Sequence, residues 1–262
     1  MPAKRPVKQI NTKSKGRPSG CKPRRAMILA AGVGKRMRPI TKKTPKPLIK
    51  VAGRMLLDWT LDRFAEEGIE TVVVNTHHFA RRIEQHLGKR QSPQILFSPE
   101  DQLLETGGGV AKALARLGGK PFFVANGDVL WLNGTNSALA RMAGAWDDGK
   151  MDALLLLHFT TDSHGYAGRG DFSVDPVGLL ARRPEREISP YYFSGVQLLH
   201  PRLFDGAPAE PFSLNLLYDR AIDKERLHGI VHDGEVFHIG TPEGLAEAEA
   251  YMRVRYAGKE RR

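Results

Sequence analysis

Apolar positions between residues 26 and 150 follow two alternating patterns. Short continuous or β-branched apolar runs predict buried strands at 26–32, 71–77, 94–100 and 121–128. Between them, apolar residues recur every three or four positions and a glycine closes each segment, which predicts helices at 55–68, 79–88 and 108–119. This alternation is typical of an α/β fold in which helices flank a Rossmann-like, mostly parallel sheet. In such sheets ligands bind beyond the carboxyl ends of the strands.

After residue 150 the pattern becomes looser. Strand-like runs are expected at 152–159, 171–175, 191–200 and 235–240. Helices are expected at 215–223 and from residue 241 onward. No repeat or linker interrupts the chain, and 41% of its residues are apolar, which is enough to build a substantial core. We therefore expect a single domain over 26–262, with two halves at about 26–150 and 151–262.

The net charge of +11 is concentrated at one end of the sequence. Residues 1–57 contain 17 Lys and Arg and no Asp or Glu, whereas the rest has 23 basic against 29 acidic residues. Residues 1–25 are rich in Pro, Gly, Ser and Lys, so they predict a disordered basic leader. Such a leader can contact nucleic acid or other anions non-specifically. A nucleic-acid-binding module driven by this leader is one alternative function for the chain.

Two further observations exclude classes of protein. The single cysteine, Cys21, leaves no disulfide framework and no thiolate metal site. No apolar run approaches the roughly 18 residues that a membrane span needs. We therefore expect a cytoplasmic protein with no membrane partner. The sequence leaves the oligomeric state open.

The second basic block, residues 35–50, follows the first predicted strand and is interleaved with Gly and Pro. It is not a Walker A loop, because Arg36 stands where that motif needs Ser or Thr and Leu29 where it needs its first glycine. It is not a dinucleotide fingerprint either, because Met37 replaces the third glycine. A different kind of phosphate site is indicated.

The stretch 29–48 resembles the signature of the sugar-phosphate nucleotidyltransferases. The resemblance rests on glycines, an Arg-Met pair and a Pro-Lys-Pro-Leu step at the spacing of that signature: Gly32, Gly34, Arg36, Met37, Pro39, Thr41, Pro45, Lys46, Pro47 and Leu48. Lys35 departs from it, because Thr or Ser is common at that position. The resemblance covers nearly the whole chain after the leader. It implies the nucleotide-diphospho-sugar transferase fold, with a nucleotide-binding half followed by a sugar-binding half.

The implied reaction joins a nucleoside triphosphate to a hexose 1-phosphate and releases pyrophosphate, so two anions must approach each other. Arg36 offers a planar fork of donors to the departing pyrophosphate, and Lys46 a positioned charge near the α-phosphate. A solvated basic surface is the alternative for Lys42, Lys43 and Lys50. The residues expected to bind nucleotide are Ala30, Ala31, Gly32, Gly34, Lys35, Arg36, Glu105, Thr106, Gly107, Gly108 and Asn126.

For the 105–108 segment we expect backbone amides exposed at a helix start. A glycine-rich helix start without a ligand is the alternative interpretation. His77 and His78 follow a predicted strand, but neighbours in an extended chain face opposite ways, so we expect them to be structural.

The resemblance also implies a metal site. Asp128 matches the aspartate that binds Mg²⁺ in the family, with Mn²⁺ as an alternative cation. His238 stands where many members have a second metal-binding Asp, and imidazole is a poor Mg²⁺ ligand. His238 could contact phosphate or a metal-bound water, Asp128 and substrate oxygens could suffice, or catalysis could be weakened. Asp171 and Asp219 are possible substitutes for the missing carboxylate.

Candidate hexose and sugar-phosphate contacts are Asp171, Arg183, Tyr192, Gly195 and Asn215, with Arg182 an equal alternative to Arg183. Within the family, the motifs most resemble N-acetylmuramate-1-phosphate uridylyltransferases of cell-wall recycling. This implies UTP and N-acetylmuramic acid 1-phosphate as substrates. Mannose-1-phosphate guanylyltransferases come second, and a non-catalytic nucleotide-sugar-binding regulator is the remaining alternative.

Overall fold

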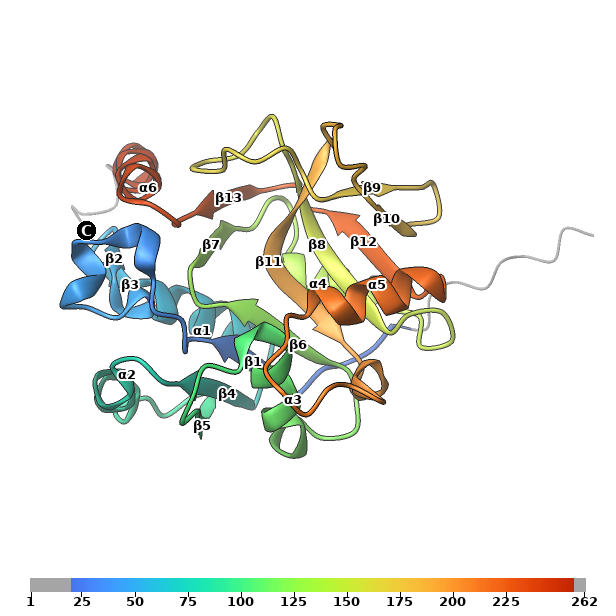
Figure 1. Cartoon of the computed structure of the whole chain (residues 1–262). Coiled ribbons are helices and arrows are strands. Elements are labelled where there is room, and N and C mark those ends of the chain that lie inside the picture. Colours follow the sequence, from blue (N-terminus) through green and yellow to red (C-terminus); the bar gives the residue numbers. More distant parts are fainter. Residues whose placement is uncertain (1–19, 257–262) are drawn as a thin grey trace, which may run out of the picture.

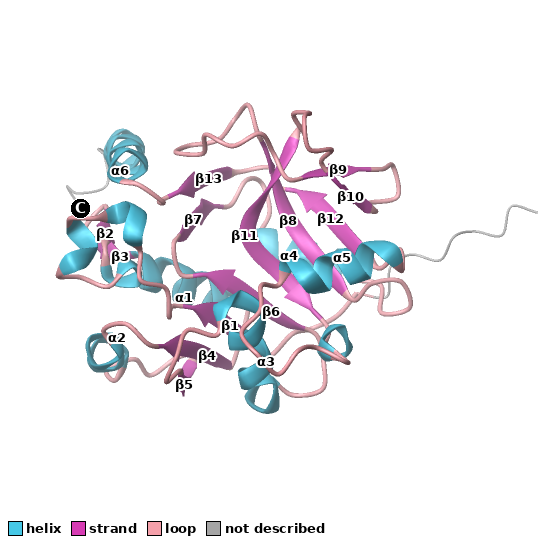
Figure 2. Ribbon diagram, in the orientation of Figure 1, coloured by secondary structure: helices cyan, strands magenta, loops and turns pink. Residues whose placement is uncertain are grey.

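The computed structural model describes residues 20–256 (Figure 1). Within this range, nine strands form the main sheet, and helices cover both of its faces (Figure 2). The predicted α/β fold is therefore confirmed. None of the helices described is long and apolar enough to cross a membrane.

The predicted leader falls largely outside the described residues, which begin at Gly20. The segment 20–24 packs against the end of another helix: the Gly20 amide donates to the Trp146 carbonyl at 3.0 Å, and the Cys21 amide to the Ala143 carbonyl at 2.8 Å. The first strand then begins at Arg25. The packed part of the chain therefore begins before the expected boundary at residue 26.

The first half of the chain forms the parallel part of the sheet. Its strands are β1 (Arg25–Leu29), β4 (Thr71–Thr76), β5 (Gln94–Pro99) and β6 (Phe122–Asn126), in the order β6-β1-β4-β5. The intervening helices are α1 (Leu56–Glu66), α2 (Ala80–Leu87) and α3 (Glu105–Leu117). Leu29 pairs with Asn75 on one side and Asn126 on the other, so the carboxyl ends of three strands are aligned.

The second half adds antiparallel pairing. Strand β11 (Tyr191–Leu199) runs antiparallel to both β6 and β8 (Ala153–Phe159), and β12 (Leu227–Val231) continues parallel to β8. The short strands β9 (Phe172–Val174) and β10 (Leu180–Arg182) extend the sheet beside β11. Helices α4 (Ala138–Ala145) and α5 (Asn215–Asp223) cover opposite faces. Strand β12 and helix α4 are additions that the sequence pattern did not predict.

Two small sheets lie beside the main one. Strand β7 (Val129–Leu132) pairs with β13 (Glu235–His238), and β2 (Lys50–Val51) pairs with β3 (Arg54–Met55). The last helix, α6 (Pro242–Tyr256), follows β13 and lies near the segment after β1 (Figure 1). The C-terminal helix therefore packs against the loop that follows β1.

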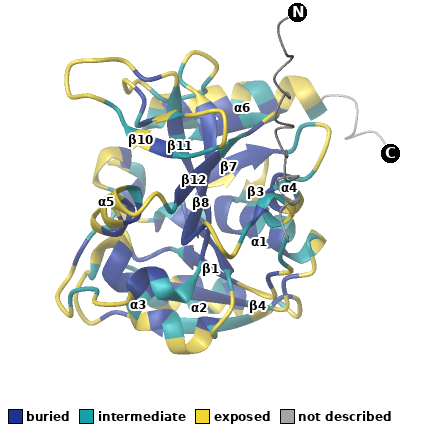
Figure 3. Ribbon diagram, turned by 90° about the vertical axis from the view of Figure 1, so that its right-hand side faces the viewer, coloured by how far each residue is buried: buried dark blue, intermediate teal, exposed yellow. Residues whose placement is uncertain are grey.

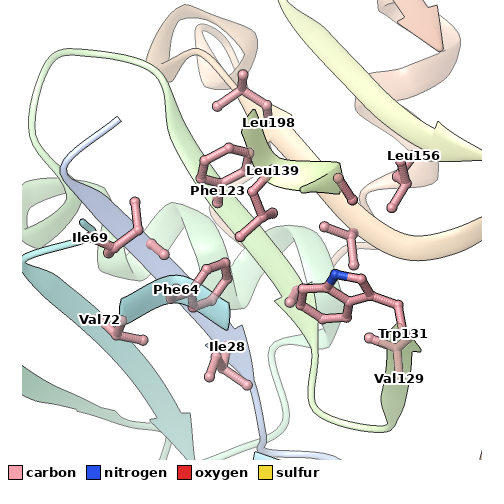
Figure 4. Packing of buried hydrophobic residues seen from close by; sticks show 14 of the residues in the cluster. Ile28, Phe64, Ile69, Val72, Phe123, Val129, Trp131, Leu139, Leu156 and Leu198 are labelled. Atoms are coloured by element: carbon pink, nitrogen blue, oxygen red, sulfur yellow. The ribbon is translucent and has the colours of Figure 1, made fainter. Parts of the chain in front are cut away.

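Apolar side chains form three clusters, two of them on opposite faces of the main sheet. The strands at the centre of the molecule are largely buried (Figure 3). Alternation along β1 sends Ile28 to one face and Met27 to the other, as the two-residue period of a strand requires. The Ile28 cluster includes Phe64, Phe123 and Trp131 (Figure 4). The third cluster joins the 35–51 segment to β7, β13 and α6. The buried apolar residues of the basic segment therefore hold it against the rest of the fold.

Candidate active site

A cleft of about 450 Å³ lies at the aligned carboxyl ends of β1, β4 and β6. Its lining is drawn from the loop after β1, the strand ends and the start of α3: Leu29, Ala30, Ala31, Gly32, Gly34, Lys35, Arg36, Lys46, Pro47, Asn75, Glu100, Leu103, Glu105, Thr106, Asn126, Gly127, Asp128 and Gly240. All three predicted catalytic residues, Arg36, Lys46 and Asp128, are brought together here. Nine of the eleven residues expected to bind nucleotide also line it.

The loop after β1 has a defined shape because one glycine allows a left-handed turn. Gly34 has a φ of 65°, and a Cβ there would come within 3.0 Å of the Thr41 methyl group. The Thr41 hydroxyl donates to the Gly34 carbonyl at 2.8 Å, which closes the loop. Met37 is fully buried, whereas its neighbour Arg36 is exposed. The buried Met37 side chain therefore fixes the backbone from which the Arg36 side chain extends into solvent.

Lys46 and Asp128 form a close ion pair in the cleft. The Lys46 Nζ lies 2.5 Å from Asp128 Oδ2, and the two side chains are 11% and 26% exposed. Lys46 lies between two buried prolines, Pro45 and Pro47, which restrict its backbone. The Gly127 amide donates to the Leu29 carbonyl at 2.9 Å and fixes the turn that carries Asp128.

The other lysines of the basic segment differ from Lys46. Lys42, Lys43 and Lys50 are exposed, and none of them lines the cleft. The interpretation of these three as a solvated basic surface agrees with this placement.

The structure places His238 beside this pair. It is the last residue of β13 and pairs with Val129, the residue after Asp128. Burial lowers the pKa of His238; the Asp128 carboxylate opposes this, while the Lys46 and Arg36 cations lower the pKa further. Burial therefore favours the neutral form of this imidazole.

The two predicted metal ligands, Asp128 and His238, lie close enough to each other to interact electrostatically. In the described part of the chain, no group of three or more His, Cys, Asp and Glu side chains could hold a metal ion. Mg²⁺ takes oxygen ligands and commonly keeps water and substrate phosphates in its shell. The donor set therefore fits a cation that substrate phosphates hold jointly with Asp128. It does not form a complete protein cage.

The glycines of α3 differ from the expectation of exposed amides. Gly107 and Gly108 lie inside the first turns of the helix, are buried and do not line the cleft. Their amides donate to the Phe212 carbonyl at 2.8 and 3.1 Å. A Cβ on Gly107 would lie 2.3 Å from the Phe212 ring. These glycines therefore let α3 pack against the 212 segment.

The sugar-half candidates lie outside the cleft lining. Asp171 accepts a hydrogen bond from the Phe193 amide at 2.9 Å. Tyr192 is buried and stacks on Tyr166 with ring centroids 4.1 Å apart; burial raises the pKa of the Tyr192 hydroxyl. Gly195 has a φ of 92° and packs against Asn126, which does line the cleft. Of these residues, Gly195 has the most direct contact with the cleft wall.

The two candidate arginines are committed to other partners. Arg183 donates to the Gly170 carbonyl at 2.9 Å and, through Nη1, to three carbonyls of the segment 184–187 at 2.8 to 3.0 Å. Arg182 pairs with Asp219 at 2.7 Å and donates to the side chain of Asn215 at 3.0 Å. Arg183 shapes a loop, while Asn215 and Asp219 are partners of Arg182.

Several residues of the cleft were missed from the sequence, chiefly Asn75 and Glu100. Both are buried polar residues at the carboxyl end of a predicted strand. The rule that ligands bind beyond the carboxyl ends of strands could have found them. Gly240 was also missed; a Cβ there would lie 2.6 Å from His238 Nε2, so a larger residue would crowd the imidazole.

Comparison with known proteins assigns the class. The family described as Nucleotidyl transferase matches residues 25–204, and the chain belongs to this family. The resemblance to sugar-phosphate nucleotidyltransferases is therefore confirmed.

Curated relatives narrow the similarity. N-acetylmuramate alpha-1-phosphate uridylyltransferase of Caulobacter vibrioides is 42% identical over 88% of this chain and 97% of that protein. The protein of the same name from Neisseria meningitidis is 38% identical over 86% and 97%. A mannose-1-phosphate guanylyltransferase catalytic subunit beta from Drosophila melanogaster is 34% identical over 83% of this chain but 60% of that protein.

Solved structures support the fold. A putative glucose-1-phosphate thymidylyltransferase from Bacillus anthracis gives a TM-score of 0.75 at 19% identity, covering 87% of this chain and 95% of that one. A UDP-glucose pyrophosphorylase in complex with UDP-glucose gives 0.71 at 18% identity, covering 89% and 99%. These likenesses show the nucleotide-diphospho-sugar transferase fold.

Gly107→Ala tests the packing role of the α3 glycines. The added methyl group meets the Phe212 ring, so we expect the free energy of unfolding to fall by about 1–3 kcal/mol. Gly144→Ala in α4 is the matched control, because no described atom outside its own helix lies within 4 Å of its added Cβ. It should stabilise by roughly 0.5–1 kcal/mol. Equal effects of the two substitutions in urea unfolding would contradict the packing role.

Proposed function

We propose that this chain transfers a uridylyl group from UTP to N-acetylmuramic acid 1-phosphate, giving UDP-N-acetylmuramic acid and pyrophosphate in cell-wall recycling. The observation that carries the proposal is the Lys46–Asp128 pair beside the glycine loop and Arg36, all within one cleft. The choice of substrates is supported by the two uridylyltransferases that match this chain over nearly their whole length. We place this reaction in the cytoplasm, because it consumes UTP.

The reaction requires the approach of two anions. A phosphate oxygen of the sugar phosphate forms a bond to the α-phosphorus of UTP, while the α–β bridging bond breaks and pyrophosphate leaves with its electron pair. Lys46 stabilises the charge that develops at the α-phosphate. Arg36, Lys35 and the amides around Gly32 and Gly34 hold the departing pyrophosphate. No proton transfer is needed for this step.

The ion pair keeps the Lys46 ammonium and the Asp128 carboxylate charged inside the cleft before substrate binds. A partly buried ammonium or carboxylate alone is costly, and each neutralises the other until substrate arrives. A phosphate then offers Lys46 a new anionic partner, which leaves the Asp128 carboxylate for a cation. Bound Mg²⁺ or Mn²⁺ would neutralise phosphate charge there, with Asp128 as its ligand and the neutral His238 beside it.

Two alternatives remain distinct from this proposal. A mannose-1-phosphate guanylyltransferase is supported by the Drosophila relative, although the chain spans only 60% of that protein. A non-catalytic nucleotide-sugar-binding regulator would bind nucleotide without releasing pyrophosphate, and the imidazole of His238 in place of a second carboxylate is the feature that favours it.

A substrate panel tests the proposal. UTP, GTP, ATP and CTP are each combined with N-acetylmuramic acid 1-phosphate, mannose 1-phosphate and glucose 1-phosphate, and pyrophosphate release is measured. We expect the fastest release with UTP and N-acetylmuramic acid 1-phosphate. Preference for GTP and mannose 1-phosphate would support the guanylyltransferase. Nucleotide binding with no release from any pair would support the regulator.

Removing each proposed catalytic charge tests the mechanism. We expect Arg36→Ala, Lys46→Ala and Asp128→Ala each to lower kcat/KM by at least about a hundredfold, the usual scale for a lost transition-state contact. Lys42→Ala is the control, because this exposed lysine of the same segment does not line the cleft. It should retain wild-type turnover. Near-normal rates in all three charge variants would contradict the mechanism.

His238→Asp tests the metal position. If His238 stands in place of a carboxylate ligand, the aspartate should preserve or raise activity with Mg²⁺. It should also lower the ratio of Mn²⁺-supported to Mg²⁺-supported rates, since imidazole suits transition metals better than Mg²⁺. Titrating both metals against each protein gives the ratio. Loss of activity with both metals would show that the imidazole has a role of its own.

A further inference from the structure

A chain of buried hydrogen bonds runs along one wall of the cleft. Ala30 follows β1, Asn75 lies near the end of β4, Glu100 follows β5 and Leu104 precedes α3. The Ala30 amide donates to Asn75 Oδ1 at 2.7 Å, and Asn75 Nδ2 donates to Glu100 Oε1 at 2.7 Å. The Leu104 amide donates to Glu100 Oε2 at 3.1 Å. Two side chains therefore connect three strand ends to a helix start.

The direction of every hydrogen bond in this network is fixed by its two ends. Backbone amides of Ala30 and Leu104 can only donate, so the groups facing them must accept. The Asn75 side-chain oxygen accepts from the Ala30 amide, so the Asn75 NH₂ group must face Glu100. Glu100 then receives two donors, one on each oxygen, and only a carboxylate accepts at both ends. The two ends therefore require one amide and one acid at positions 75 and 100, and this chain has the amide at 75 and the acid at 100.

The network is buried and closely packed. Asn75 is 2% exposed and Glu100 5% exposed. A Cβ on Gly109 of α3 would lie 2.9 Å from both Asn75 Nδ2 and Glu100 Oε1. The glycine therefore lets the helix lie against the pair. An unmatched donor at this depth has little access to water and is costly.

We propose that Asn75 and Glu100 are positioning residues that set the distance between the glycine loop and the start of α3, and so determine nucleotide affinity. The segments that they join contribute the wall residues Ala30, Leu103 and Glu105. Lys46 and Asp128 are paired with each other rather than with this network. Disturbing the network should therefore weaken nucleotide binding more than turnover. The identity of the nucleotide rests on the proposed function.

A swap of the two chemical types tests the proposal. Asn75→Asp alone places two carboxylates next to each other, at positions 75 and 100. Glu100→Gln alone directs the new side-chain NH₂ at another donor, either the Leu104 amide or the Asn75 NH₂. In the double variant the carboxylate introduced at position 75 accepts from the Ala30 amide and from the side-chain NH₂ introduced at position 100, whose oxygen accepts from Leu104. We expect each single change to raise the Kd for UTP about tenfold or more and the double variant to return it to within about threefold of wild type.

Binding is measured by calorimetry with UTP, and with GTP in parallel, without a sugar phosphate. The comparison of single and double variants therefore gives a result even if the wild-type chain binds nucleotide but releases no pyrophosphate. That outcome would contradict the proposed function and leave the present proposal standing. In turnover assays we expect KM for UTP to rise while kcat and KM for the sugar phosphate stay within about threefold. A double variant no better than the singles, or a wild type that binds neither nucleotide, would overturn the proposal.

Asp152→Asn controls for a general loss of stability. Asp152 is a buried carboxylate, 8% exposed, that accepts from Arg202 and Arg226 and does not line the cleft. It should lower the melting temperature and leave the Kd for UTP unchanged; an equal loss of binding would overturn the proposal. If a single variant fails to fold, Gly109→Ala crowds the same pair from α3. An unchanged Kd for UTP in that variant would also overturn it.

Discussion

The ion pair between Lys46 and Asp128 is the interaction on which the site depends. It joins the loop after β1 to the turn after β6, two neighbouring parallel strands whose ends are in register. Each charge is partly withdrawn from water and is stabilised by the other. Because an ammonium can exchange a carboxylate for a phosphate, and a carboxylate an ammonium for a metal ion, the site can receive an anion and a cation together. The pair therefore holds two opposite charges inside the cleft.

That arrangement depends on apolar packing underneath the charged loop. Met37 is buried in a cluster shared with β7, β13 and α6, so the basic segment is fixed to the C-terminal part of the chain. The same C-terminal part brings His238 next to the pair and Gly240 into the cleft lining. The opposite wall depends on the buried acceptors of Asn75 and Glu100. Hydrophobic contacts thus support one side of the cleft, and hydrogen bonds of fixed direction support the other.

Residues of one type serve different purposes in this molecule. Gly34 provides a left-handed turn, whereas Gly107 provides room for an aromatic ring. Lys46 and Arg36 line the cleft, while Arg183 holds the carbonyls of a loop. A charged or flexible residue near a motif is therefore not by itself a ligand contact; what it faces in the fold decides its role. His238 is the clearest example, because burial is the main cause that lowers the pKa of its imidazole.

Local patterns along the chain were enough to predict the alternation of strands and helices and the place of the basic loop after β1, because these follow from periodicity. The set of Arg36, Lys46 and Asp128 was predicted from the resemblance to a family, and the fold brings the three side chains into one cleft. The helix over 215–223 was also predicted with its observed bounds. The antiparallel insertion of β11, the neighbours of His238, the Asn75–Glu100 network and the loop role of Arg183 became visible only in the folded chain. Each of these depends on contacts between segments far apart in the chain, and no local pattern of residues encodes which distant group a polar side chain will meet.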